Sequence, residues 1–175
     1  MPKRLTDEEK VRRARLKYLA ETGYKEDPLH RYGQHKWEDK YYMLHRKAYS
    51  MVIYDEHMED IVDGGELSYN IGAILPREID LEELCFVDLE ELQEAYKEKK
   101  KTGVVNLIKI KGVFFNVKLF MDVAKCVDAE EVCVYRKIGS ELFVHTLEGR
   151  FGKALVCPMF IHKLDENTNL IMEVA

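Results

Sequence analysis

The sequence predicts an α+β fold in which an antiparallel β-meander packs against a helix. Three observations support this class. A capped helical segment opens the chain, a strand leads into a second capped and strongly amphipathic helix near residue 120, and three strand-like runs separated by turn residues follow that helix. The length of 175 residues fits one domain with an appendage. Hydrophobic residues make up 46% of the chain, which is more apolar surface than a disordered chain carries.

The first predicted helix begins after Thr6 and ends before Gly23. Thr6 followed by Glu9 is a capping-box pattern, and the acidic residues 7–9 lie in the first turn, where the helix dipole favours negative charge. The apolar stripe of this helix is narrow, and basic side chains crowd its other faces. We therefore expect an exposed basic face formed by Lys10, Arg12, Arg13, Arg15 and Lys17.

A loop over residues 24–35 precedes a second expected helix, which runs from Trp37 to about Asp63. Apolar residues recur there at three- and four-residue steps, and Gly64-Gly65 would end the helix. The β-branched run at residues 52–54 favours a strand instead, so the extent of this helix stays open. These patterns divide the chain into a helical N-terminal extension, residues 1–65, and an α+β domain, residues 66–175.

The second part of the chain reads as alternating strands and helices. A weak strand and turn are expected over residues 66–79, and a short buried strand over residues 84–87. Asp88 then caps a helix that ends by Gly103. A strand over residues 105–110 leads to a helix that begins at the cap Asn116 and ends near Val127. A polar turn at residues 128–131 is followed by strands at 132–135, 142–146 and 154–157, the last closed by Pro158.

Three stretches of this second part form a recognisable series: Phe115–Asp122 at the start of a helix, the charged turn Asp128–Val132, and Ala154–Met159 at the end of the last strand. In this series, residues 104–161 resemble one β-α-β-β-β module of the bacterial DNA polymerase sliding clamp. The resemblance covers 58 of the 175 residues. It implies a fold in which helices face DNA. It places neither a second module nor the peptide groove of that family by residue, so ring formation is not implied.

Charge is distributed unevenly along the chain. Residues 1–50 hold 13 Lys and Arg against 8 Asp and Glu, residues 51–100 hold 4 against 15, and residues 101–175 hold 10 against 9. Such asymmetry points to an electrostatic partner or to solvated helix faces. No apolar run approaches the ~18 residues of a membrane span. The four cysteines lie in apolar runs without a Cys-x-x-Cys pair, which is typical of a reducing compartment, so we expect a cytoplasmic protein.

The leading hypothesis is a non-enzymatic accessory protein in the DNA metabolism of a phage or mobile element, with no cofactor. Lys10, Arg12, Arg13, Arg15 and Lys17 would contact phosphates. The alternative is a protein–protein interaction module, in which the acidic segment Glu78–Glu98 would imitate a nucleic acid.

Two further sets of residues were weighed for a site. Trp37, Tyr41 and Tyr42 would serve as a partner anchor, although Trp37 and Tyr41 also fit the core stripe of the expected second helix. The third hypothesis is a metal-dependent enzyme with His30, His35 and Asp39 as ligands. No His-Glu-x-x-His pattern occurs, so no metal ligand or catalytic residue is assigned.

Overall fold

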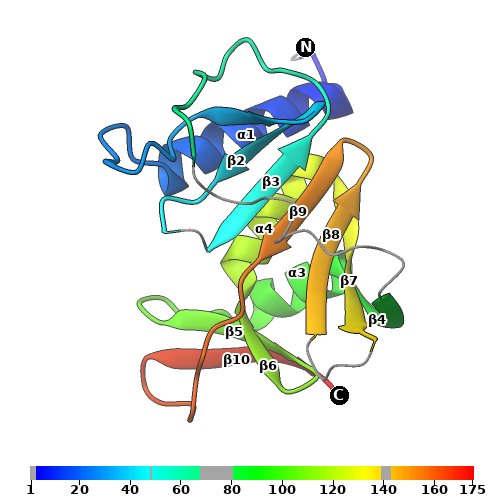
Figure 1. Cartoon of the computed structure of the whole chain (residues 1–175). Helices are drawn as coiled ribbons and strands as arrows, with labels where there is room; N and C mark the ends of the chain where they lie inside the picture. The colour runs from blue at the N-terminus through cyan, green and yellow to red at the C-terminus, as the bar shows by residue number, and fades with distance from the viewer. Residues whose placement is uncertain (1–2, 48, 68–80, 139–142) are drawn as a thin grey trace.

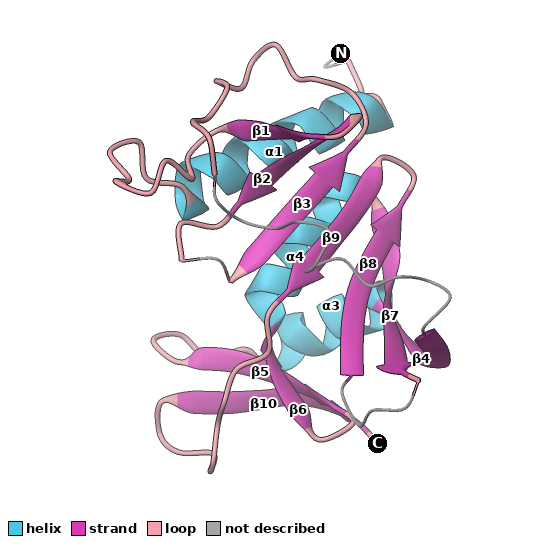
Figure 2. Ribbon diagram, viewed as in Figure 1, coloured by secondary structure: helices cyan, strands magenta, loops and turns pink. Residues whose placement is uncertain are grey.

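Two β-sheets and three helices make up the described part of the chain, which in this computed structural model comprises residues 3–47, 49–67, 81–138 and 143–175 (Figure 1). The larger sheet has seven strands in the order β1-β2-β3-β9-β8-β7-β4, and every neighbouring pair is antiparallel. The smaller sheet has the order β10-β5-β6, with β10 parallel to β5. This arrangement confirms the predicted α+β class (Figure 2).

The strands of the larger sheet are β1 (Gln34–Trp37), β2 (Lys40–Leu44), β3 (Ser50–Tyr54), β4 (Leu81–Asp88), β7 (Ala129–Lys137), β8 (Phe143–Gly149) and β9 (Gly152–Val156). Those of the smaller sheet are β5 (Val105–Ile110), β6 (Val113–Asn116) and β10 (Thr168–Val174). The strands expected near residues 85, 108, 133, 144 and 155 are therefore confirmed. The expected weak strand at residues 66–79 and the turn at residues 139–140 fall almost wholly outside the described residues.

Each of the three helices in the described residues starts where a capping side chain was predicted. Thr6 Oγ1 accepts from the Glu9 amide at 3.2 Å and starts α1 (Asp7–Thr22). Asp88 caps α3 (Leu89–Lys99), and Asn116 caps α4 (Val117–Val127), each by accepting amide protons of the first turn. The helix starts are local hydrogen-bonding events, which is why the sequence reveals them. Asp128 ends α4 in the left-handed region with a φ of 55°.

The helix expected from Trp37 to Asp63 is wrong, because the chain there forms the three strands β1, β2 and β3. Strands β2 and β3 are buried on both faces: Met43 and Val52 face the helices, whereas Tyr42 and Ile53 belong to a second apolar cluster on the opposite face. A strand covered on both faces loses the alternation of polar and apolar residues that identifies a strand. The remaining apolar run happens to match a helical spacing.

The seven-stranded sheet also overturns the expected helical extension at residues 1–65. Strand β3 pairs with β9, with Ser50 opposite Val156 and Ile53 opposite Lys153, so the N-terminal strands continue the sheet of the C-terminal half. Gly152 lies at this junction with a φ of 151°, and a Cβ there would be 2.1 Å from the carbonyl oxygen of Ile53. Only glycine allows the two strands to approach in this way.

Six of the seven strands belong to two helix-and-meander units joined at β3 and β9, and β4 adds an edge strand beside β7. Helix α1 precedes the meander β1-β2-β3, and α4 precedes the meander β7-β8-β9. The two helices pack against each other on the same side of the sheet (Figure 1). Along residues 105–156 the order is β5-β6-α4-β7-β8-β9, so a strand that was not expected, β6, separates β5 from the helix. Both β5 and β6 belong to the smaller sheet rather than to the sheet of β7, β8 and β9.

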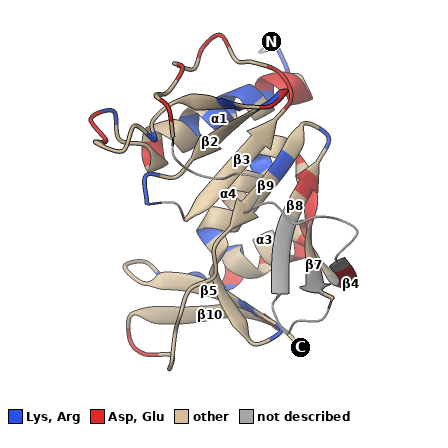
Figure 3. Cartoon of the chain, in the orientation of Figure 1, with Lys and Arg blue, Asp and Glu red and all other residues tan. Residues whose placement is uncertain are grey.

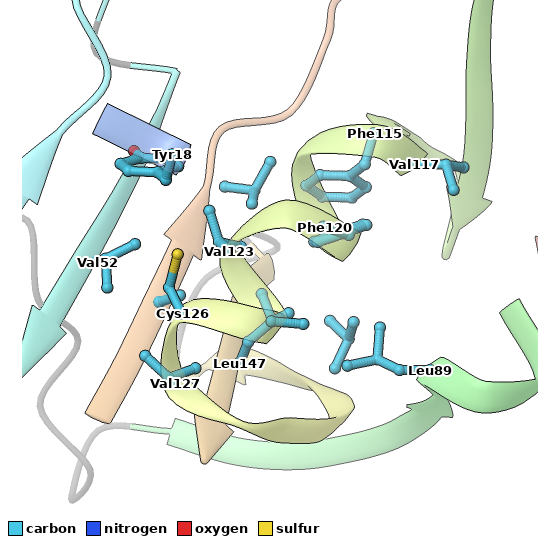
Figure 4. Close-up of a cluster of buried hydrophobic side chains, with 14 of the residues drawn as sticks. Tyr18, Val52, Leu89, Phe115, Val117, Phe120, Val123, Cys126, Val127 and Leu147 are labelled. Carbon is cyan, nitrogen blue, oxygen red and sulfur yellow. The ribbon is translucent and has the colours of Figure 1, made fainter. Parts of the chain in front are cut away.

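The main core lies between this pair of helices and the sheet (Figure 4). Helix α4 contributes Phe120, Val123 and Val127, all fully buried, and α1 contributes Tyr18 from the neighbouring position. Burying each such side chain contributes roughly 1.5–3 kcal/mol, so the α1–α4 layer is held by apolar contact rather than by its surface charges.

Candidate nucleic-acid interface

Arg15 is the basic residue of α1 whose position differs from the sequence-based expectation. It is only 7% exposed, and its Nε and Nη2 donate to the carbonyl oxygens of Cys126 and Phe151, both at 2.8 Å. The guanidinium carbon lies 4.2 Å from the centre of the Tyr54 ring. Burial lowers the pKa of Arg15 below its ordinary value, and the group still carries its charge at neutral pH. Arg15 thus caps the C-terminal end of α4 and does not belong to the exposed basic face.

The other four basic residues predicted on α1 are exposed, and three of them have carboxylate partners. The Nζ of Lys10 lies 4.0 Å from Asp7, and that of Lys17 lies 3.9 Å from Glu21. Arg12 pairs with Asp60, whereas Arg13 has no carboxylate within 4 Å among the described residues. Pairs at this exposure contribute about 0–1 kcal/mol, so these cations can exchange a carboxylate for a phosphate.

Helix α4 adds two lysines to the same layer. Lys118 Nζ lies 2.8 Å from Asp122 and 3.4 Å from Glu21, so it links the start of α4 to the end of α1. The hydrogen bond to Asp122 raises the pKa of Lys118. Lys125 is exposed, and no described carboxylate lies within 4 Å of it. The surface of the two helices therefore carries cations along both, interleaved with acidic residues.

The loop between β2 and β3, residues 45–49, carries basic and aromatic side chains that the sequence reasoning missed. It is one of the basic segments in Figure 3. Arg46 and Lys47 are exposed, and Tyr49 is 49% exposed with its ring centre 5.2 Å from that of His45. Burial, with the nearby charges of Arg46 and Lys47, lowers the pKa of His45. The signal was visible as two cations beside an aromatic residue, but it lay inside the wrongly expected helix.

The three predicted partner anchors do not lie on one surface. Trp37 and Tyr42 belong to the apolar cluster on the face of the sheet opposite the helices, where Tyr42 is 4% exposed and contacts the ring of His35. Tyr41 packs against the main core and lies over Tyr54, with 6.3 Å between ring centres. The structure thus separates Tyr41 from the other two, because neighbouring residues of a strand point to opposite faces.

A buried glutamine organises the segment that follows β3. Gln34 is 1% exposed, and its Nε2 donates to the carbonyl oxygens of Met58 and Ile61 at 2.6 and 2.8 Å. Its Oε1 accepts from the hydroxyl of Tyr54 at 2.9 Å. This segment forms one wall of a hollow of about 470 Å³ beside α1, and it carries Asp60, the partner of Arg12. Carboxylates outnumber cations around that hollow, so it disfavours a phosphate group.

The described part of the acidic segment Glu78–Glu98, residues 81–98, lies in β4 and α3 and forms one surface with the start of β7, whereas residues 78–80 lie outside the described residues. A hollow of about 470 Å³ opens among Asp88, Glu90 and the first residues of β7. Seven exposed carboxylates of this surface form no ion pair with any described residue: Glu83, Glu90, Glu91, Glu94, Glu98, Glu130 and Glu131. Because these seven carboxylates are exposed and form no ion pair with a described residue, they are available to pair with cationic groups of a partner.

The three residues of the metal hypothesis do not form a site in the described structure. His35 is 5% exposed, and its two ring nitrogens each lie 3.0 Å from a carbonyl oxygen, that of Gly65 and that of Arg31. Asp39 lies in the turn between β1 and β2, and His30 lies in the preceding loop. Across residues 3–47, 49–67, 81–138 and 143–175, no group of three His, Cys, Asp or Glu side chains is placed to hold a metal ion.

Comparison of the chain with protein-family models, with curated proteins and with solved structures finds no match. Within the described residues, none of the helices has the length and apolar character needed to cross a membrane. The function must therefore be argued from the geometry and the charges of the molecule.

Proposed function

We propose that the protein is a non-enzymatic accessory factor of DNA metabolism that contacts nucleic acid with the layer formed by α1 and α4. The observation that carries this proposal is the paired arrangement of two helix-and-meander units, whose helices lie together on one side of a continuous sheet. The sequence resemblance to a sliding-clamp module covers only the second unit. In the clamp family two such modules pair to make one domain, and their helices face DNA.

The cations of this layer supply the phosphate contacts. They are exposed and lie on both helices: Lys10, Arg12, Arg13, Lys17, Lys118 and Lys125. Their carboxylate partners lie on the surface as well, so the layer as a whole is close to neutral. We therefore expect modest affinity with strong dependence on salt. If four of the six cations contact phosphates of a duplex, raising the salt from 50 to 200 mM weakens binding about a hundredfold.

Binding of labelled duplex and single-stranded DNA, measured by fluorescence anisotropy at these two salt concentrations, tests the proposal. The variant with Arg12→Ala, Arg13→Ala and Lys17→Ala removes three cations from α1. The matched control carries Lys97→Ala, Lys99→Ala and Lys101→Ala, which removes the same charge at the exposed end of α3. We expect the α1 variant to lose most of the affinity and of the salt dependence, and the control to keep both. Absence of binding to either DNA at 50 mM salt overturns the proposal.

The acidic surface favours a second candidate function, binding of a basic protein. Its seven uncompensated carboxylates would pair with Lys and Arg of the partner. A labelled lysine-rich peptide should bind the protein at low salt, and the combined substitutions Glu90→Gln, Glu130→Gln and Glu131→Gln should abolish this binding. Equal binding by that variant would exclude the acidic surface as the site.

A further inference from the structure

The backbone of the β2–β3 loop is fixed at several points by hydrogen bonds to three different elements. The Arg46 amide donates to the carbonyl oxygen of Thr22 at the end of α1, at 3.0 Å. The carbonyl oxygen of Tyr49 accepts from the amide of Cys157 after β9, at 2.8 Å. Within the loop, the Lys47 amide donates to Nδ1 of His45 at 3.0 Å, and the His45 amide donates to Ser50. These bonds tie the described residues of the loop, 45–47 and 49, to the end of α1, to the start of β3 and to the segment after β9.

The side chains of Arg46, Lys47 and Tyr49 in the same loop are exposed to solvent. Tyr49 stacks on His45 and has Lys47 Nζ 6.0 Å from its ring centre, yet about half of the residue remains exposed. Arg46 and Lys47 are exposed, and neither has a carboxylate within 4 Å among the described residues. A backbone held in this way, with a half-exposed aromatic ring and two exposed cations in one loop, loses little conformational entropy when a ligand binds.

Two further cations lie at the same end of α1. Lys17 and Lys118 both contact Glu21, the residue before Thr22, which anchors the loop. The four cations Lys17, Arg46, Lys47 and Lys118 are accompanied here by the carboxylates of Glu21 and Asp122, so this end of the helical layer has a positive balance. A negatively charged polymer that crosses the α1–α4 layer would therefore meet the loop at an end of the layer where positive charge is in excess.

We propose that this loop binds an unpaired base of single-stranded nucleic acid, with Tyr49 stacking on the base and Arg46 and Lys47 contacting the flanking phosphates. An exposed tyrosine ring offers a stacking surface for any base, and stacking requires a base that is not enclosed in a duplex. Arg46 and Lys47, which precede the ring in the same loop, would supply the positive charge for the phosphates that flank the stacked base. This inference rests on the proposed function and names the form of nucleic acid that the protein prefers.

Anisotropy of a labelled 20-nucleotide oligothymidine, titrated with the full chain at 50 mM salt, tests this site. We expect Tyr49→Ala to weaken binding about 5- to 150-fold, the range expected for loss of one stacked base, and Tyr49→Phe to bind within about twofold of the unaltered chain. Tyr24→Ala is the matched control, because Tyr24 is also 49% exposed but lies in a different loop. It should leave the affinity unchanged.

The cations provide a second measurement that does not depend on the tyrosine. Arg46→Ala and Lys47→Ala remove exposed side chains, and each should reduce the slope of log affinity against log salt by about 0.7 for a single strand. A labelled polyglutamate of equal charge serves as an anion without bases, and a duplex of matched length serves as DNA without unpaired bases. Both should bind more weakly than oligothymidine.

The outcomes separate this inference from the proposed function. If the unaltered chain binds neither single-stranded nor duplex DNA, the proposed function fails, and the loop site fails with it. If it binds oligothymidine but Tyr49→Ala and the two cation variants bind equally well, the loop site is overturned while the proposed function stands. Equal affinity for the duplex or for polyglutamate also overturns the unpaired-base site, because stacking would then contribute nothing.

Discussion

Replacing Arg15 by methionine tests whether this cation stabilises the fold rather than binding DNA. The side chain donates two hydrogen bonds to backbone carbonyl oxygens that are 111 and 136 residues away in sequence, so it links α1 to α4 and to the turn before β9. A hydrogen bond with a charged donor contributes roughly 1.5–3 kcal/mol. Arg15→Met keeps most of the apolar stem but removes both donors. Burying the guanidinium also costs desolvation free energy, which the variant avoids. We therefore expect Arg15→Met to lower the free energy of unfolding by about 3 kcal/mol.

Urea unfolding followed by tryptophan fluorescence or circular dichroism measures this loss. With a slope near 2 kcal/mol per molar, the midpoint of Arg15→Met should fall by about 1.5 M urea. Arg15→Lys keeps the charge but lacks the forked guanidinium that donates to both carbonyl oxygens. Its urea midpoint should therefore lie between those of the unaltered protein and of Arg15→Met. Arg13→Met is the matched control: Arg13 is exposed and has no described ion-pair partner, so its midpoint should move by no more than about 0.25 M. An unchanged midpoint for Arg15→Met would falsify the structural role.

Three other predictions concern single residues. Asn116→Ala removes the acceptor for amide protons in the first turn of α4 and should lower the unfolding free energy by about 1 kcal/mol in the same urea assay. Gly152→Ala places a methyl group 2.1 Å from a carbonyl oxygen of β3 and should lower it by at least about 2 kcal/mol. In an NMR titration, His57 should titrate above pH 6.5, because its hydrogen bond to Asp63 raises the pKa, and His45 should titrate below pH 6.5, because burial lowers it. The stability that His57 contributes is therefore present below pH 6.5 and is lost as the pH rises through the pKa of His57 in the folded protein. The stability that neutral His45 contributes is present above pH 6.5 and is lost as the pH falls through the pKa of His45 in the folded protein.

Each of these predictions has a control or an outcome that contradicts it. Asn116→Asp keeps a capping oxygen and should leave the midpoint nearly unchanged. Gly112→Ala is a useful comparison for Gly152→Ala: Gly112 also has a positive φ, but no atom lies within 4 Å of the added methyl group, so the difference between the two reports the contact with β3. Asp63→Asn should bring the pKa of His57 back toward 6.5. The two histidine assignments are refuted if both residues titrate at the same pH.

The elements predicted correctly are those that local chemistry determines. Thr6, Asp88 and Asn116 each cap a helix through hydrogen bonds to residues two or three positions away, so the sequence holds the whole signal. The apolar runs of β7, β8 and β9 were recognisable for the same reason, and residues 150–151 form the short turn between β8 and β9. The helix expected after Trp37 failed because its residues are buried on both sides by distant elements.

The candidate sites show the same division. The sequence identified exposed cations on α1, and four of the five are exposed in the structure. It could not show that Arg15 turns inward, because its acceptors belong to the end of α4 and to the turn before β9. It also could not show that Tyr49 lies beside His45 and Lys47, since that depends on residues 45–47 and 49 belonging to a loop between strands rather than to a helix.

The sequence by itself therefore determined the α+β class, the starts of the three helices and the strands that follow α4, since each depends on residues close together in the chain. Only the tertiary structure decided that β3 joins β9, that the chain contains two helix-and-meander units, and which cations remain on the surface. These features depend on contacts across more than 100 residues, such as the bond from Arg15 to Cys126, and no local pattern encodes which distant group will bury a given side chain.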